Sequence, residues 1–338
     1  MTHPETAPDL QSVWQIMTAF QLSHAFKAAV ELELFTKIAE GNRTAAEISA
    51  STGASERGIR ILSDALTVAG LLSKSGNSYS LTEASAFFLD KNSPAYVASA
   101  VEFIMSPTQL RGFMDLTNAV RRGGTTVEGD GSVDPESPMW VTFARAMAPM
   151  MYPAAEAVAA NVALLSDAAF KVLDIAAGHG LFGITVGKHY ANAEIYAVDW
   201  PNVLTVATEN AAKFGVGDRH HLIPGSAFDV DLAGKYDVIL NTNFLHHFDR
   251  PTCERFVAKL ANSLADGGKI LTLEFTPNDD RVSPPPQALF ALIMLSATPG
   301  GDAYTFRELK EIFEGAGLTN NTNISLSPMP QNLIISSK

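Results

Sequence analysis

A glycine-rich turn after a short apolar run is the first feature of this sequence whose residue types could do chemistry. Gly178, Gly180 and Gly183 satisfy the pattern G-x-G-x-x-G, and Asp199 follows 21 residues after Gly178. Glycines in this pattern allow a tight turn and a close approach of the backbone to a ligand, and the later acid contacts a ribose. The spacing fits a dinucleotide-binding turn, although the pattern alone is a weak signal.

A second acidic residue, Asp174, precedes the turn and changes the ligand that the turn favours. A carboxylate here opposes a pyrophosphate but suits a ligand that carries an ammonium and a sulfonium, as S-adenosylmethionine does. NAD is further disfavoured because the α/β pattern begins at residue 171 and no second nucleotide-binding half follows it. The alternative for Asp174 is a purely structural carboxylate that caps a helix or a loop.

The elements that must position these residues are short β-branched runs that alternate with helical patterns. The predicted strands are residues 171–175, 194–198, 221–223, 236–241, 269–275 and 332–336. Such alternation predicts a parallel, doubly wound α/β sheet. Because ligands of these sheets bind beyond the carboxyl ends of the strands, we expect the functional residues directly after each strand.

The first hundred residues have a different pattern. A capping box at Thr44 and Glu47 and a cap at Ser55 predict two helices, and the Gly76-Asn77 turn predicts a hairpin. The apolar positions expected on the second helix are Ile59, Leu62, Leu66 and Val68. Helix, turn, helix and hairpin together predict a winged helix.

The charge of this winged helix argues against DNA as its partner. Residues 1–105 contain 7 Lys or Arg against 11 Asp or Glu, so the basic footprint that DNA requires is missing. A packing or dimerisation module is favoured instead, because the first segment has more apolar surface than a three-helix unit readily buries. The residues that supply it are Val13, Ile16, Met17, Phe20, Phe26, Val30, Leu34 and Phe35.

The composition bounds the remaining classes of protein. The 338 residues are 46% hydrophobic and 18% charged, which is typical of a soluble globular chain with room for two domains. The net charge of −12 disfavours nucleic acid, and the longest apolar stretch, ten residues at 288–297, is about half of a membrane span. Without a secretory pattern at the N-terminus, and with Cys253 alone, we expect a cytoplasmic protein with no membrane partner.

These motifs together resemble the S-adenosylmethionine-dependent small-molecule O-methyltransferases of the plant phenolic type and their bacterial relatives. Besides the winged helix, the resemblance is carried by residues 174–183, 199–201, 224–228, 245–248 and 299–301. It implies an α/β fold, with a Rossmann-like class I methyltransferase domain at 166–338 and a mostly helical winged-helix dimerisation domain at 1–105. Residues 106–165 would be a helical bridge and loop that contribute to the substrate pocket of a homodimer.

The resemblance implies a set of cofactor contacts around the glycine turn. Asp174, Gly178 and Gly180 would hold the methionine part of S-adenosylmethionine, Asp199 would bind the ribose hydroxyls, and the stretch after the third strand would face adenine. The further cofactor residues implied are Trp200, Ser226, Ala227, Phe228 and Asn241. Two positions depart from the family: Ala176 stands where its first glycine usually is, and Ser226 replaces an acid.

The chemistry that the resemblance implies is methyl transfer to a hydroxyl. A phenol, with a pKa of about 10, needs a base, and an imidazole with a pKa of about 6.5 is suited to that task. The resemblance assigns the base to His246 and its orienting carboxylate to Glu274. The second carboxylate of the plant enzymes falls at Ala303, so either the neighbouring Asp302 replaces it or His246 is held on one side only.

The resemblance also implies substrate contacts. They would come from Phe143, Met147, His247, Met294 and Thr298, where His247 replaces an acid that touches the substrate in relatives. These mostly apolar residues suit a small, flat aromatic or polyketide-like acceptor, whose identity the sequence does not name. The same residues could instead belong to the core.

Several alternatives stay open. His246, His247 and Asp249 have metal-ligand side chains, but adjacent histidines at the start of a helix should diverge by about 100°, so we expect no metal. The same cofactor could serve C- or N-methylation or a non-methylating reaction, and an NAD enzyme or a DNA-binding regulator are more distant alternatives. The polar stretch 123–138 is expected to be a lid or a surface loop.

Overall fold

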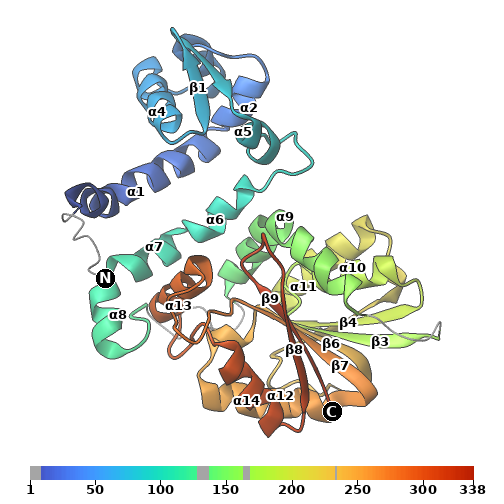
Figure 1. The fold of residues 1–338 in the computed structure, drawn as a ribbon. Coiled ribbons are helices and arrows are strands. Elements are labelled where there is room, and N and C mark those ends of the chain that lie inside the picture. The colour runs from blue at the N-terminus through green and yellow to red at the C-terminus, as the bar shows by residue number, and fades with distance from the viewer. Residues whose placement is uncertain (1–8, 128–136, 163–167, 233) are drawn as a thin grey trace, which may run out of the picture. The chain divides into compact units, whose positions relative to one another are not determined.

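The computed structural model describes residues 9–127, 137–162, 168–232 and 234–338. Its contacts divide the chain into two compact units, Met1–Val101 and Glu102–Lys338, which Figure 1 shows as ribbons. The first unit is mostly helical, and the second contains the large sheet.

The first unit is built as the sequence predicts a winged helix to be. Its elements are α1 (Leu10–Glu31), α2 (Leu34–Ala39), α3 (Ala45–Thr52), α4 (Glu56–Val68), β1 (Leu72–Ser75), β2 (Ser78–Leu81) and α5 (Glu83–Phe88). The capping box at Thr44 and Glu47 is confirmed, as is the cap in which the Ser55 hydroxyl accepts from the Gly58 N–H. The hairpin of β1 and β2 is confirmed too, but Val68, expected on the apolar face of α4, is 85% exposed at the end of the helix.

Helix α1 leaves much of its apolar surface uncovered. Near its C-terminal end Val30 is buried, and Leu34 and Phe35 at the start of α2 are buried with it. The apolar residues along the first half of α1 are exposed instead: Leu10, Val13, Trp14, Ile16, Met17, Phe20 and Leu22. The expected surplus of apolar surface is therefore confirmed for this helix.

The second unit begins with helices and continues as an α/β domain. The helices that precede the sheet are α7 (Pro107–Met114), α8 (Leu116–Arg122) and α9 (Pro138–Ala160), and α6 (Val101–Ile104) lies at the division between the units. The strands are β3 (Phe170–Ile175), β4 (Ala193–Asp199), β5 (His220–Pro224), β6 (Tyr236–Thr242), β7 (Leu264–Glu274), β8 (Asn320–Ser325) and β9 (Asn332–Ser337). The helices among them are α10 (Leu181–His189), α11 (Pro201–Lys213), α12 (Arg250–Ser263), α13 (Pro285–Ala297) and α14 (Phe306–Gly315).

The sheet is mixed rather than fully parallel. In the described residues its seven strands have the order β5-β4-β3-β6-β7-β9-β8, and the first five are parallel. Strand β9 pairs antiparallel with both β7 and β8, so the expectation of a parallel sheet is wrong at this edge. Sequence analysis missed β8 because its sequence, Asn-Asn-Thr-Asn-Ile-Ser, lacks the apolar run of a strand.

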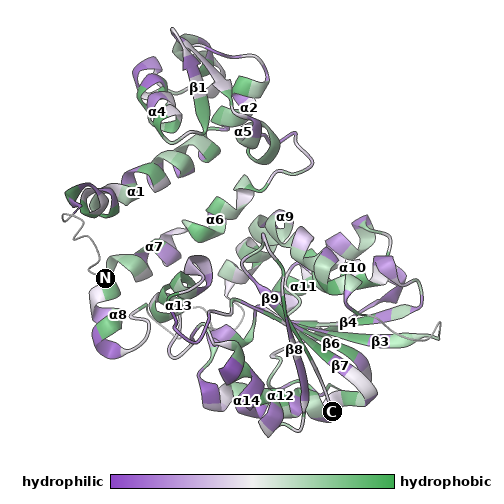
Figure 2. Ribbon diagram, viewed as in Figure 1, coloured by the Kyte–Doolittle hydropathy of each residue, from purple (hydrophilic) through white to green (hydrophobic). Residues whose placement is uncertain are grey.

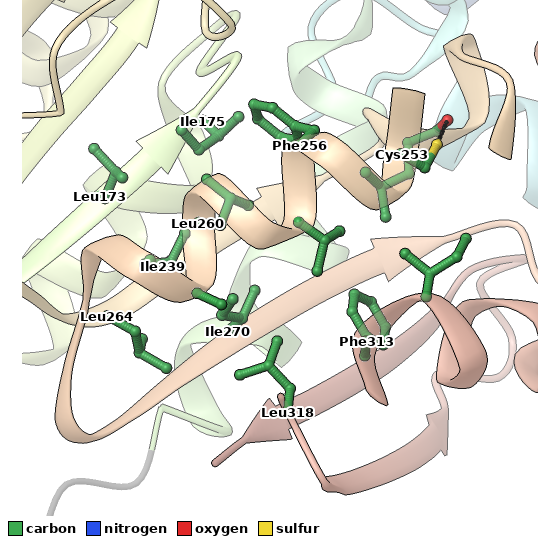
Figure 3. Packing of buried hydrophobic residues seen from close by; sticks show 14 of the residues in the cluster. Leu173, Ile175, Ile239, Cys253, Phe256, Leu260, Leu264, Ile270, Phe313 and Leu318 are labelled. Atoms are coloured by element: carbon green, nitrogen blue, oxygen red, sulfur yellow. Dashed lines mark hydrogen bonds between the residues drawn. The ribbon is translucent and has the colours of Figure 1, made fainter. Parts of the chain in front are cut away.

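Apolar side chains fill the space between the sheet and the helices. Figure 2 shows hydrophobic colour along much of β3, whereas α14 carries long hydrophilic stretches. Leu173, Ile175 and Ile239 of the sheet pack with Phe256 and Leu260 of α12, and Figure 3 shows this packing from close by. Each fully buried side chain of this size stabilises the fold by about 1.5–3 kcal/mol. Together, these contacts hold the strands in place relative to one another.

One glycine of the turn motif is required by packing. A Cβ on Gly183, in the first turn of α10, would lie 2.6 Å from Ile195 Cγ2 and 2.8 Å from Asp174 Oδ2. Its absence lets α10 lie directly against β3 and β4. Gly187, one turn later, has room, because its Cβ would meet no atom closer than 3.4 Å.

Gly183→Ala is therefore expected to lower the free energy of unfolding by about 1–3 kcal/mol, the usual cost of overpacking. Gly187→Ala in the same helix is the matched control, and it is expected to be neutral or to stabilise by up to about 1 kcal/mol, since alanine favours helices. Urea unfolding of the two variants and the wild type measures both effects. Equal stabilities of the two variants would contradict this account of Gly183.

Candidate active site

The carboxyl ends of the parallel strands bring four of the predicted polar residues to one edge of the sheet. Asp174 is the second-last residue of β3, Asp199 and Glu274 end β4 and β7, and Asn241 is the second-last residue of β6. The register pairs Ile175 with both Val198 and Asn241, so the strands end at the same level. This is the edge at which a doubly wound sheet binds its ligands.

The glycine turn connects β3 to α10 through three residues in the left-handed region. Their φ angles are +49° at Ala176, +57° at Gly178 and +73° at Gly180. Ala176 stands where the family usually has glycine, and its Cβ makes this conformation cost about 1–2 kcal/mol. Asp199 braces the turn, because its Oδ2 accepts from the Gly178 N–H at 2.7 Å and its Oδ1 from the Trp200 N–H at 2.7 Å.

Asp174 is fully buried, with a hydrogen bond at one of its two oxygens. Oδ2 accepts from the Gly183 N–H at 2.9 Å, whereas Oδ1 is buried without a partner among the described residues. Burial raises the pKa of Asp174 to about 8 and, likewise, that of Asp199 to about 6. The backbone donors at each carboxylate oppose the shift without cancelling it. Because burial disfavours the charged form of each carboxylate, a cationic ligand beside it would stabilise that form.

The segment after β5 forms a single tight turn. The Ser226 carbonyl accepts from the Asp229 N–H at 3.0 Å and the Val230 N–H at 2.9 Å, and the Ser226 hydroxyl accepts from the Phe228 N–H at 3.2 Å. Ala227 is buried, and the Phe228 ring packs on Phe244, Phe248 and Phe256. The turn is joined to β4 by a hydrogen bond from the Gly225 N–H to the Asp199 carbonyl at 2.9 Å.

His246 and Glu274 form a buried pair beyond the ends of β6 and β7. His246 Nδ1 lies 2.6 Å from Glu274 Oε2, and the two side chains are only 6% and 4% exposed. Glu274 Oε1 accepts from the Phe244 N–H at 3.0 Å and the Leu245 N–H at 2.8 Å. Because the carboxylate accepts from Nδ1, the network assigns the ring proton to Nδ1 and leaves the lone pair on Nε2.

The backbone that carries His246 is fixed from several sides. Asn243 bends the chain out of β6 with a φ of +52°, a conformation that asparagine tolerates better than most residues. The Leu245 carbonyl then accepts from the Cys253 thiol at 3.2 Å, and the Phe248 carbonyl from the Tyr304 hydroxyl at 2.6 Å. Burial raises the pKa of the Cys253 thiol to about 12, so this thiol stays protonated. The sequence did not predict these roles of Asn243, Cys253 and Tyr304, because the residues are distant in the chain or lack a motif.

A glycine loop closes over the backbone of His246. A Cβ on Gly301 would lie 2.2 Å from the His246 carbonyl oxygen, so only glycine allows this approach. The Asp302 N–H donates to the same carbonyl at 3.0 Å. The Asp302 carboxylate bonds Arg281 Nη1 at 3.0 Å and the Ala303 N–H at 2.8 Å, so Asp302 reaches His246 through its backbone N–H.

The two adjacent histidines lie side by side. The ring centroids of His246 and His247 are 4.3 Å apart, so the two rings do not diverge as expected, although both residues lie on a short 3₁₀ turn, Leu245–His247. Burial holds the pKa of His247 well below its ordinary value, and the neighbouring His246 acts in the same direction. Among the described residues, no three His, Cys, Asp or Glu side chains are grouped as a metal site would need.

A row of aromatic rings runs from the glycine turn to the histidine pair. Phe143 of α9 stacks on His179 of the glycine turn at 6.5 Å and meets the edge of Trp140 at 5.5 Å. Trp140 in turn lies 5.4 Å from the His247 ring in an edge-to-face contact. On the other side Phe290 of α13 lies 4.8 Å from His246. Sequence analysis had singled out neither Trp140 nor Phe290.

Comparison with known proteins decides the family. Residues 14–91 match the model of an O-methyltransferase dimerisation domain, and residues 116–319 match the model of an O-methyltransferase domain. The chain belongs to the O-methyltransferase family. It is an S-adenosylmethionine-dependent O-methyltransferase with the Rossmann-like class I domain that the sequence predicts.

Curated relatives and solved structures resemble this O-methyltransferase over most of its length. The 3-hydroxy-5-methyl-1-naphthoate 3-O-methyltransferase of Streptomyces sahachiroi is 27% identical over 305 residues, which cover 89% of this chain and 87% of the relative. A proposed O-methyltransferase from Nostoc punctiforme PCC 73102, known from its crystal structure, is 46% identical with a TM-score of 0.94 over 98% and 100% of the two chains. Human N-acetylserotonin methyltransferase in complex with S-adenosylmethionine shares the fold at 21% identity, with a TM-score of 0.84 over 100% and 99%.

The residues of this O-methyltransferase fit the cofactor of the family. The buried, unpartnered Oδ1 of Asp174 suits an ammonium group, and the left-handed glycines bring backbone close to the same edge of the sheet. Among the described residues, Asn241 Oδ1 is a second buried acceptor without a partner.

In the described part of the chain, no helix combines the length and hydropathy that crossing a membrane requires.

The predicted substrate residues are mostly buried. Met147 and Met294 are 8% and 4% exposed, and Phe143 is partly buried. Thr298 is fully buried, and its hydroxyl donates to the Met294 carbonyl at 2.7 Å and accepts from the Gly301 N–H at 2.8 Å. The predicted loop 123–138 lies largely outside the described residues, but Thr125 at its start is buried and donates to the Ser296 carbonyl at 2.7 Å.

The pKa of Asp174 predicts how pH acts on the ligand-free protein. Its folded-state pKa of about 8 lies above the value of about 3.9 in an unfolded chain. The folded protein therefore keeps this proton up to a higher pH than the unfolded chain does. The contribution of Asp174 to the free energy of unfolding is complete below pH 4 and declines as the pH rises toward 8. The decline is at most about 1.4 kcal/mol per pH unit.

Asp174→Asn removes this titration and keeps an acceptor for the Gly183 N–H. The stability of the variant relative to the wild type is expected to increase steadily between pH 5 and pH 8, as measured by urea unfolding without ligand. Asp218→Asn, at an exposed position, is the control and should leave the pH dependence unchanged. Parallel stability curves for Asp174→Asn and the wild type would contradict the raised pKa.

Proposed function

We propose that His246 is the base that removes the proton of the acceptor hydroxyl, and that Glu274 orients and stabilises it. The observation that carries this proposal is the buried contact of 2.6 Å between His246 Nδ1 and Glu274 Oε2. In this pair the Glu274 carboxylate fixes both the orientation and the tautomer of the His246 ring, as the orienting acid of a catalytic triad does for its histidine base. The lone pair on Nε2 is then available to accept a proton.

The chemistry follows from the charges of these groups. When bound, S-adenosylmethionine supplies a methyl group on a positively charged sulfur, which an oxygen nucleophile displaces. His246 Nε2 takes the proton of the hydroxyl as the oxygen attacks, and the charge of the resulting imidazolium is stabilised by Glu274 at Oε2. The two backbone N–H groups at Oε1 keep the carboxylate in place throughout, so no reorganisation is needed at the moment of transfer.

The cofactor is proposed to lie along the carboxyl edge of the sheet. Asp174 and the glycine turn at Gly178 and Gly180 hold its methionine part, and Asp199 accepts from the ribose hydroxyls. The remaining contacts are assigned to Trp200, Ser226, Ala227, Phe228 and Asn241. Supporting this arrangement, the unpartnered oxygens of Asp174 and Asn241 are acceptors at that edge that lack a protein donor.

The acceptor is proposed to be a small aromatic or polyketide-like hydroxyl compound. The Streptomyces sahachiroi relative is named for a hydroxylated naphthoate, and the ring row through Phe143, Trp140 and His247 offers apolar, flat surfaces next to the base. Phe143, Met147, His247 and Met294 are the proposed contacts. Thr298 contributes indirectly, since its hydroxyl holds the loop at Gly301 in place.

The domain arrangement is part of the same proposal. Residues 1–105 form a homodimer through the exposed apolar face of α1, supported by the match to a dimerisation domain. Residues 106–165 supply α9 to the acceptor pocket, and residues 166–338 bind the cofactor. An enzyme of this composition would act in the cytoplasm on a small molecule, without nucleic acid.

Two variants test the proposed base. His246→Gln removes the proton acceptor and is expected to lower kcat by roughly 10²-fold or more. Glu274→Gln keeps an acceptor for the two backbone N–H groups but presents an N–H₂ group to His246, which forces the wrong tautomer and should lower kcat at least as much. Both should bind S-adenosylhomocysteine as the wild type does, as measured by calorimetry, with turnover followed on a panel of phenols and naphthols.

His189→Gln is the matched control, because His189 also pairs with a glutamate, Glu156, but on the surface and through Nε2, at 2.7 Å. Its turnover should equal that of the wild type. Unchanged turnover in His246→Gln would contradict the proposed base.

A further inference from the structure

Lys259 of α12 makes an arrangement that neither the motifs nor the proposed chemistry account for. Its ammonium donates to three backbone carbonyls of the turn after β5: Ala227 at 3.0 Å, Phe228 at 2.7 Å and Val230 at 2.8 Å. An ammonium has three N–H donors, and here each one has a carbonyl partner. One side chain of a helix thereby holds a whole turn of a loop.

Three carbonyls of the turn have Lys259 as a hydrogen-bond donor. The Ser226 carbonyl is satisfied inside the turn by the Asp229 and Val230 N–H groups. The carbonyls of Ala227, Phe228 and Val230 instead converge on the ammonium, as the last carbonyls of a helix converge on a cap.

The electrostatics support a fixed, charged contact. Burial lowers the pKa of Lys259, and the nearby Asp229 and Asp231 oppose that shift. Charge-assisted hydrogen bonds of this kind are about twice as strong as neutral ones. The turn is therefore held with little freedom against α12.

We propose that Lys259 is a positioning residue for the nucleobase of the cofactor. This inference rests on the proposed function, in which Ser226, Ala227 and Phe228 face adenine. Lys259 binds two of these residues, Ala227 and Phe228, by their carbonyls, and also the carbonyl of Val230, from the side of α12. The opposite end of the turn is tied to β4 by the Gly225 N–H on the Asp199 carbonyl, next to the carboxylate assigned to the ribose. Lys259 thus fixes the distance between the adenine and ribose contacts.

The sequence gives the positioning role more weight in this chain. The resemblance implies an acid at the position of Ser226, where this chain has a hydroxyl in place of a carboxylate. Recognition of the adenine then depends on the backbone of this turn and on the Ser226 hydroxyl. These groups contact the adenine only if the turn holds them in the correct position. Lys259 supplies that rigidity without touching the ligand.

Lys259→Met tests the proposal, since methionine keeps a long apolar stem and removes the ammonium. The dissociation constants of S-adenosylhomocysteine and of 5′-methylthioadenosine, which share the nucleoside, are measured by calorimetry. Both are expected to rise by the same factor, roughly tenfold, a change that one weakened polar interaction can produce. The loss should fall on the KM for S-adenosylmethionine rather than on kcat or the KM of the acceptor. Lys259→Arg should recover part of the affinity.

Lys310→Met is the control, because Lys310 is half-exposed on α14, where it forms an ion pair with Glu314. Affinity of Lys259→Met within twofold of the wild type would overturn the inference and leave the proposed function intact. A fall in kcat with an unchanged KM for S-adenosylmethionine would also overturn it. A wild-type enzyme that binds neither ligand would overturn the proposed cofactor site itself, which keeps the two failures apart.

Discussion

The buried hydrogen bond between His246 and Glu274 is the interaction around which the rest of the site is arranged. A carboxylate inside a protein is tolerated only where donors replace the water that it loses. Glu274 receives three such donors, from the His246 ring and from the Phe244 and Leu245 N–H groups. Those bonds require the chain to turn sharply after β6, which the left-handed Asn243 makes possible. The geometry of the proposed base therefore depends directly on the local fold of the backbone after β6.

A second buried carboxylate at the same sheet edge, Asp174, has fewer hydrogen-bond donors around it than Glu274 has. Asp174 has a single backbone donor, at one oxygen, and burial raises its pKa to about 8. It lacks the donors that would favour its charged form, so a cationic ligand can supply what the protein does not. Two acids with different surroundings can serve different tasks, one supporting a base and one binding a cation. Gly183 makes this possible by allowing α10 to lie against Asp174.

Local patterns in the sequence predicted much of this structure. The glycine turn, the parallel strands and the winged helix follow from motifs and periodicity, and strand ends then brought Asp174, Asp199 and Glu274 to one edge. Contacts between distant segments could not be predicted in this way. The close approach of Gly301 to His246 depends on tertiary packing, the polar strand β8 lacks an apolar pattern, and helix geometry alone does not predict the contact between the His246 and His247 rings.

The dependence of the His246→Gln defect on the acidity of the acceptor tests the central claim most directly. Methyl transfer is measured for the wild type and the variant on two phenols of similar shape, one protonated and one already ionised at the assay pH. If His246 removes the proton, the wild type should exceed the variant by roughly 10²-fold or more on the protonated phenol and only a few-fold on the ionised one. An equal defect on both phenols would contradict the account.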